Sequence, residues 1–170
     1  MRVLAVDPGL TRCGVGVIDG DSSRRVALVA AGVIRTGPEL PTEERLLAIQ
    51  TELSEYFIEF APDRVAVERV FAQNNVRTAI GTAQASAVVM LCAAARGLPV
   101  TSHTPSEVKA AVTGNGRADK PQIAAMVKRL LRLEQPAKPA DVSDALALAI
   151  CHVWRAPFTN RLSVAAGRLP

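Results

Sequence analysis

Four carboxylates stand where the chain is expected to leave a sheet or to begin a helix. Asp7 and Glu68 each follow a short apolar run, whereas Asp141 and Asp144 are three residues apart at the start of a long apolar stretch. That spacing places Asp141 and Asp144 on one face of a helix. Clustered acids repel one another unless a cation neutralises them. Oxygen ligands without Cys or His favour magnesium or manganese, and two such ions can promote phosphodiester hydrolysis.

Each carboxylate taken alone also has an ordinary structural interpretation. Asp7 could belong to a turn, and Glu68 could be a solvated acid at the end of a strand. Asp141 could cap the last helix, with Asp144 supporting its first turn. Asp144 is followed directly by the apolar residues 145–150, so we expect it to be partly buried and to need a partner. The catalytic interpretation therefore depends on all four acids converging.

The elements that must position these acids follow from the apolar pattern. Short apolar runs between turn residues predict strands, and helical periodicity with capping residues predicts helices. The expected strands are residues 2–6, 14–18, 25–34, 64–67 and 98–101. The expected helices begin at the cap Thr42, near Asn75, at Pro105, at Lys120 and near Asp141, and the last of them ends near Trp154. Short connections make the first three strands an antiparallel meander, and a helical crossover then lets the fourth lie parallel to the first. Asp7 and Glu68 would then meet at the carboxyl ends of two neighbouring strands.

Composition indicates a globular protein and leaves nucleic acid open as a partner. The 170 residues, 49% of them hydrophobic, predict one domain over residues 1–157, followed by a tail, residues 158–170, that we expect to be poorly ordered. The net charge of +4 and the pI near 9.3 make nucleic acid a candidate partner, although many basic proteins bind none. Three widely spaced cysteines predict buried, reduced thiols in a cytoplasmic protein. No apolar run reaches the roughly 20 residues that a membrane span needs, so we expect no membrane partner.

Several motifs together resemble the RuvC family of Holliday-junction resolvases. They occur in the family's order: VDPG at residues 6–9 with Gly14, ERVF at 68–71, TPSEVK at 104–109, GNG at 114–116, Asp119-Lys120, and DVSDALA at 141–147. The resemblance extends from about residue 2 to about residue 156. One such motif would be weak, but the whole ordered series is specific.

The resemblance implies a ribonuclease-H-like α/β fold, with a five-stranded mixed sheet of order 3-2-1-4-5 and helices on both faces. It implies a homodimer that resolves four-way junction DNA by paired symmetric nicks in homologous recombination and DNA repair, together with the branch-migration proteins RuvA and RuvB. By motif match, Asp7, Glu68, Asp141 and Asp144 bind two Mg²⁺ ions, which Mn²⁺ can replace. The third of these acids is His in some relatives. Small residues between 79 and 87 could admit a partner helix or pack internally, so the homodimer rests on the resemblance.

Further residues are assigned to catalysis or DNA contact in the same way. Lys109 and Lys120 match basic residues that assist catalysis and contact DNA, and Phe71 matches an aromatic residue that stacks on an unpaired base. Arg117, in the loop between the two lysines, is a further candidate for DNA contact. From the residues alone, Phe71 is more simply a hydrophobic staple for the next helix, and the three cations are solvated charges.

Three other functions fit parts of the sequence. The D-x-G-x-T turn at residues 7–11 resembles the phosphate loop of actin-like and sugar-kinase ATPases, but those proteins need two such domains and this chain is too short. A non-catalytic junction-binding module would be expected to lack one of the four acids, and none is missing. An enzyme that trims ribosomal RNA precursors shares the fold, but TPSEVK and DVSDALALA favour the resolvase.

Overall fold

Five strands form one mixed sheet of order β3-β2-β1-β4-β5. The computed structural model describes residues 1–70 and 76–166, and of residues 157–166 only the helical backbone. The strands are β1 (Arg2–Asp7), β2 (Arg12–Gly20), β3 (Val26–Arg35), β4 (Arg64–Glu68) and β5 (Val100–His103). The first three are antiparallel, and β4 and β5 run parallel to β1. The predicted sheet and strand order are confirmed.

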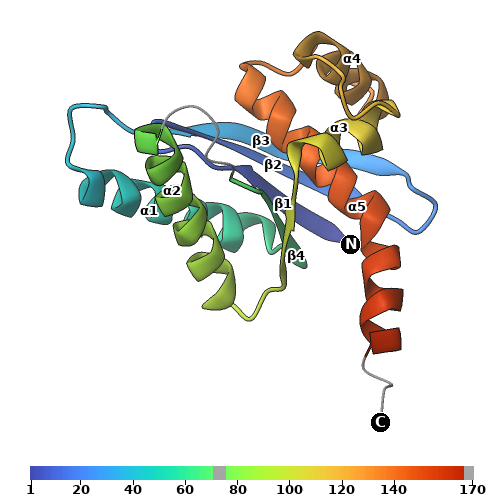
Figure 1. Cartoon of the computed structure of the whole chain (residues 1–170), viewed down its shortest axis with the longest axis horizontal. Helices are drawn as coiled ribbons and strands as arrows, with labels where there is room; N and C mark the ends of the chain where they lie inside the picture. The colour runs from blue at the N-terminus through green and yellow to red at the C-terminus, as the bar shows by residue number, and fades with distance from the viewer. Residues whose placement is uncertain (71–75, 167–170) are drawn as a thin grey trace.

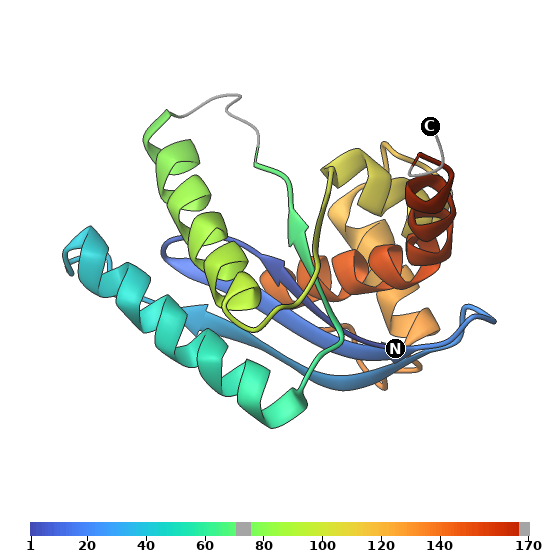
Figure 2. The same cartoon turned by 90° about the horizontal axis from the view of Figure 1, so that it is seen from below.

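Helices cover both faces of this sheet (Figures 1 and 2). One face carries α1 (Thr42–Phe60) and α2 (Val76–Ala94), and the other carries α3 (Pro105–Thr113), α4 (Lys120–Leu130) and α5 (Ala140–Ala166). Each face has its own apolar core. Residues 3–6 of β1 are all apolar because they contribute to both cores, Val3 and Ala5 to one and Leu4 and Val6 to the other.

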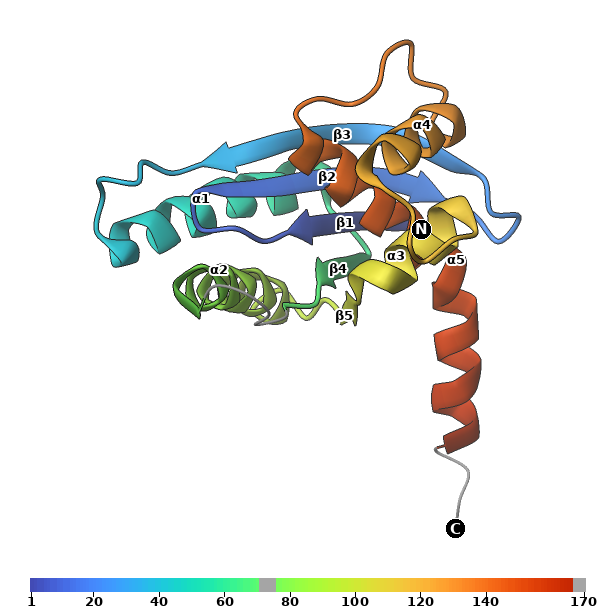
Figure 3. The same cartoon turned by 45° about the horizontal axis from the view of Figure 1, so that its top comes forward.

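The helix α5 lies directly against β1 and β2, and its last turns extend past the sheet (Figure 3). Glycines in β2 permit this close approach. A Cβ atom at Gly14 would overlap the backbone carbonyl oxygen of Asp141, and one at Gly16 would lie 3.0 Å from Cδ2 of Leu146. The start of α5, which carries two of the four acids, is therefore held at the end of the sheet where β1 terminates.

Several predicted ends of helices and strands differ from the structure. The helix α1 has Pro41 as its N-cap, not Thr42, because Pro41 already provides the extended backbone that this position requires. The strand β5 starts at Val100 rather than at residue 98, because the amide of Leu98 donates to the carbonyl of Ala93 and closes the end of α2. The helix α5 continues past Trp154 to Ala166. The separation of residues 158–170 as a tail stays a prediction, since residues 167–170 lie outside the described part.

The three cysteines agree with the prediction from the sequence: Cys13, Cys92 and Cys151 are free and buried.

The helix α2 is long and apolar enough to cross a membrane by length and composition. Its mean hydropathy is 1.3 over 18 residues, and 33% of that stretch is buried. One such helix is weak support for a membrane span. The helix also carries exposed apolar side chains, which bear on the assembly proposed below.

Candidate active site

Asp7 and Glu68 end two neighbouring parallel strands. Val6 of β1 pairs with Val67 of β4, so the next residue on each strand reaches the same edge of the sheet. Asp144, on the first turns of α5, faces them across a cleft of about 280 Å³. The cleft is lined by Asp7, Glu68, Pro105, Val108, Lys109, Lys120, Ile123, Asp144 and Ala147. The topology thus brings together acids that are far apart in the sequence.

The carboxylates of this cleft perturb one another. Burial raises the pKa of Asp7 to about 7, and the negative charges of Glu68, Asp144 and Asp141 add to that increase. Burial also raises the pKa of Glu68, with Asp144 contributing in the same direction. Each ionised acid therefore makes its neighbours harder to ionise. An added cation would relieve this repulsion.

Asp141 takes a different place from the other three acids. It is not among the residues that line the cleft, and its carboxylate Oδ2 accepts a hydrogen bond from the guanidinium Nη2 of Arg12 at 2.5 Å. Its charge still contributes to the raised pKa of Asp7, so Asp141 lies at the rim of the same site. Sequence reasoning missed Arg12, because the second strand was expected to start only at residue 14. The earlier start of β2 is what places this cation beside α5.

Lys120, at the start of α4, and Lys109, in the middle of α3, both line the cleft. Nζ of Lys120 donates to Oδ2 of Asp144 at 3.0 Å, and this hydrogen bond raises the pKa of Lys120. Lys120 is the first residue of α4, whose N-cap Asp119 forms a capping box with Gln122. Lys109 lies on α3, which begins with Pro105 after the predicted capping box of Thr104. Capping therefore determines where both lysines stand.

The sequence also predicts DNA contacts for Phe71 and Arg117. Phe71 belongs to residues 71–75, which are outside the described part of the chain. Arg117 is exposed in the loop between α3 and α4, and its backbone amide donates to Oδ1 of Asn115 at 3.0 Å. Arg117 does not line the cleft. Both assignments stay predictions.

A pair of buried histidines lies beside the acids and was not singled out from the sequence. His103 pairs in register with Glu68 at the end of β5, and its Nε2 is 3.1 Å from Nδ1 of His152 on α5. Both side chains are buried, and Nε2 of His152 has no hydrogen-bond partner among the described residues. Burial lowers the pKa of both rings, that of His152 to about 4. The pair joins β5 to α5 in the neutral state.

The donor set fits a hard divalent cation, but the acids are not gathered into a closed cage. Within residues 1–70 and 76–156, no three His, Cys, Asp or Glu side chains stand close enough together to hold a metal ion. Two of the four carboxylates are instead paired with cations, Asp141 with Arg12 and Asp144 with Lys120. Three of the expected ligands thus line one cleft and the fourth lies at its rim. For all four to bind a metal, their side chains would have to rearrange.

The sheet is ribonuclease-H-like and carries acids at the ends of two adjacent central strands. A third acid lies on the helix packed across them. This arrangement defines a class of nucleases. Comparison with known proteins names the family within it. Residues 3–152 match the profile of the family "Crossover junction endodeoxyribonuclease RuvC", and the chain belongs to this family.

The similarity covers nearly the whole chain. A crossover junction endodeoxyribonuclease RuvC of Streptomyces griseus is 63% identical over 170 residues, which is 99% of this chain and 83% of that protein. One from Thermobifida fusca is 57% identical over 163 residues, 96% of this chain and 90% of that protein. The solved structure of T. thermophilus RuvC in complex with a Holliday junction substrate superposes with a TM-score of 0.89 at 33% identity, covering 94% of this chain and 96% of that one.

Proposed function

We propose that this chain resolves Holliday junctions by metal-dependent phosphodiester hydrolysis, with Mg²⁺ as the ion and homologous recombination and DNA repair as the setting. The observation that carries the proposal is the meeting of Asp7, Glu68 and Asp144 at one cleft flanked by two lysines. Family membership supports the choice of DNA junctions as substrate, because a relative of the same fold was solved with a Holliday junction.

Each residue of the cleft has a role in this proposal. Asp7, Glu68 and Asp144, joined by Asp141 from the rim, would hold Mg²⁺, which supplies an activated water and stabilises the leaving oxygen. Lys109 and Lys120 bind phosphate oxygens and position the strand. Water adds to phosphorus and the bond to the 3′ oxygen breaks, leaving a 5′-phosphate and a 3′-hydroxyl. Lys120 must release Asp144 when the phosphate arrives.

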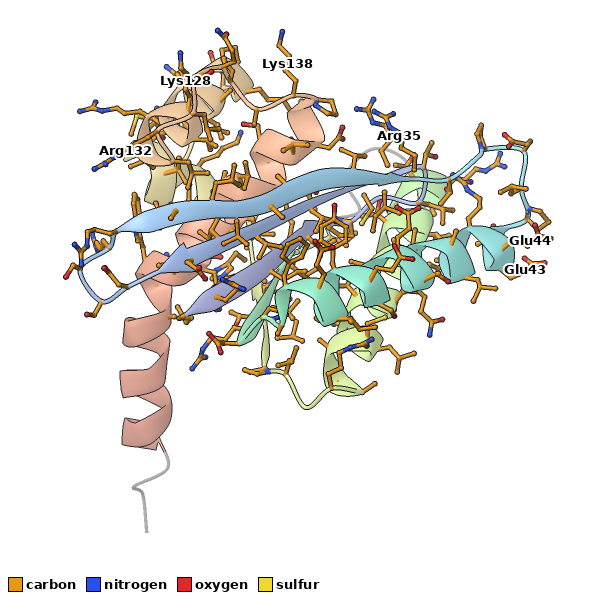
Figure 4. The ribbon with its side chains drawn as sticks, turned by 180° about the vertical axis from the view of Figure 1, so that it is seen from behind. Arg35, Glu43, Glu44, Lys128, Arg132 and Lys138 are labelled. Carbon is orange, nitrogen blue, oxygen red and sulfur yellow. The ribbon has the colours of Figure 1, made fainter. Side chains whose placement is uncertain are left out.

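The distribution of charge supports an extended DNA surface on the side of the sheet that carries α3, α4 and α5. Arg35, Lys128, Arg132 and Lys138 lie along that side of the molecule, whereas Glu43 and Glu44 lie on α1 on the other side of the sheet (Figure 4). Basic side chains bind duplex arms through their phosphates, independently of sequence. We propose that Arg117 and Phe71 add contacts near the crossover.

Two symmetric nicks require two active sites, and α2 offers a surface for a second copy. Val76, Ile80 and Leu91 are 73%, 54% and 66% exposed on this helix. Apolar side chains exposed in this number indicate an interface, and a homodimer with a two-fold axis is the simplest assembly. Family resemblance extends the proposal to RuvA and RuvB as partners and to a cytoplasmic location.

A cleavage assay on synthetic DNA tests this function. A four-way junction and a linear duplex of the same sequence are incubated with the protein, with and without Mg²⁺. We expect paired nicks in the junction alone and only with Mg²⁺, and we expect Asp7→Asn to bind the junction without cutting it. Equal cleavage of both DNAs would make the protein a general nuclease, and cleavage by Asp7→Asn at the wild-type rate would remove Asp7 from the mechanism.

A further inference from the structure

Arg12, on β2, faces the start of α5 and is a cation that none of the sequence motifs pointed to. Its guanidinium pairs with Asp141, a residue 129 positions away in the sequence. Both side chains are partly exposed, at 43% for Arg12 and 27% for Asp141. The backbones here are held by the contact between Gly14 and the carbonyl of Asp141. The fold therefore fixes the two backbones from which these side chains reach each other.

The surroundings of Arg12 are basic on one side and acidic on the other. Arg12 lies directly opposite Arg35 in the antiparallel ladder, so the two side chains leave the sheet on the same face. On the acidic side, Asp141 also acts on Asp7. A guanidinium keeps its charge at any pH that the fold tolerates. Because both side chains are partly exposed, each can exchange its partner for another ion or for water.

We propose that Arg12 is a positioning residue that holds Asp141 at the rim of the metal-free site and competes with divalent cations for this carboxylate. Once released, the guanidinium faces the path of the DNA beside Arg35, where it binds a backbone phosphate. The inference rests on the proposed metal-dependent function, and it adds a residue that couples ion binding to DNA binding.

Direct binding of Mn²⁺ to the DNA-free protein, measured by calorimetry, tests the competition without any readout of cleavage. We expect Arg12→Gln to lower the Kd for Mn²⁺ by about two- to fivefold, the range set by the strength of a partly exposed ion pair. Arg25→Gln is the matched control. It removes the same charge and breaks an ion pair, that of Arg25 with Asp21 at 2.8 Å, in the turn at the far end of β2. Its Kd should equal that of the wild type.

A double-mutant cycle separates competition for Asp141 from a general effect of charge. In an Asp141→Asn background, Arg12→Gln should lose most of its effect on the Kd. Equal tightening in both backgrounds, or an unchanged or weaker Kd for Arg12→Gln alone, would overturn the role given to Arg12. Arg12→Lys keeps the charge without the paired donors, and it should give an intermediate Kd.

The same titrations distinguish this inference from the proposed function. Asp7→Asn should lose Mn²⁺ binding whatever Arg12 does. If the wild type binds Mn²⁺, Asp7→Asn does not, and Arg12→Gln equals the wild type, only the inference fails. If the wild type itself binds no Mn²⁺, the metal site is wrong and both proposals fall.

Discussion

Gly14 of β2 packs against the backbone carbonyl of Asp141, so closely that a side chain at residue 14 would occupy the position of the carbonyl oxygen. This contact sets the distance between the sheet and the first turn of α5. Because Asp141 lies on that turn and Asp144 follows three residues later on the same helix, the contact also sets the position of two acids relative to Asp7.

Gly14→Ala should therefore affect stability and the site together. The added methyl forces α5 away from β2, and we expect the free energy of unfolding to fall by about 1–3 kcal/mol, with cleavage reduced further than stability alone explains. Urea unfolding and a junction-cleavage assay measure the two effects. Gly116→Ala is a suitable control, since its Cβ would meet no atom closer than 3.3 Å. Equal stability of Gly14→Ala and wild type would contradict the close packing.

Asp7→Asn should stabilise the metal-free protein even though it removes a metal ligand. The raised pKa of Asp7, about 7 against 3.8 for a free side chain, means that the ionised form is disfavoured by folding. The free-energy cost of keeping Asp7 ionised in the folded protein is fully present above pH 7 and disappears as the pH falls toward 3.8. We expect a gain of roughly 2 kcal/mol at pH 8 in a chelating buffer, measured by urea unfolding, and little gain near pH 4. A variant less stable than wild type at pH 8 would show that Asp7 is not under repulsive strain.

Stability should fall in acid because of His152. Burial lowers the pKa of His152 from 6.5 to about 4, so between these pH values the unfolded chain binds a proton that the folded protein does not. The stability that the neutral ring provides is fully present above pH 6.5 and is lost as the pH falls toward 4. Compared with His152→Leu, the wild type should lose up to about 3 kcal/mol between pH 7 and pH 4. The opposing contribution of Asp7 is common to both proteins and cancels in this difference. Parallel pH profiles of urea unfolding would refute the prediction.

The exposed side of α2 should mediate the proposed homodimer. Leu91→Glu and Ile80→Glu each place a charge on this side and should yield monomers in sedimentation equilibrium, because burying an unpaired charge in an apolar interface is costly. Leu28→Glu is the control, since Leu28 is an exposed apolar residue on the edge strand β3, away from α2. A Leu91→Glu protein that sediments as a dimer would move the interface elsewhere.

Much of the site could be predicted because it depends on topology. The apolar runs that end at Asp7 and Glu68 identify two strands, and the connections between strands make those two parallel neighbours. The capping box at Thr104 could likewise be recognised, because its interactions span only three residues. Such features follow from local patterns and from the limited ways in which a chain can cross a sheet.

The sequence by itself therefore determined the class of fold, the sheet edge where the acids gather and the family to which the chain belongs. Only the tertiary structure decided which polar side chains pair: Arg12 with Asp141, Lys120 with Asp144, and His103 with His152. These partners are 129, 24 and 49 residues apart. A side-chain pair of that kind depends on where whole elements pack against one another, to within a few tenths of an ångström, and no local pattern of residues encodes that distance.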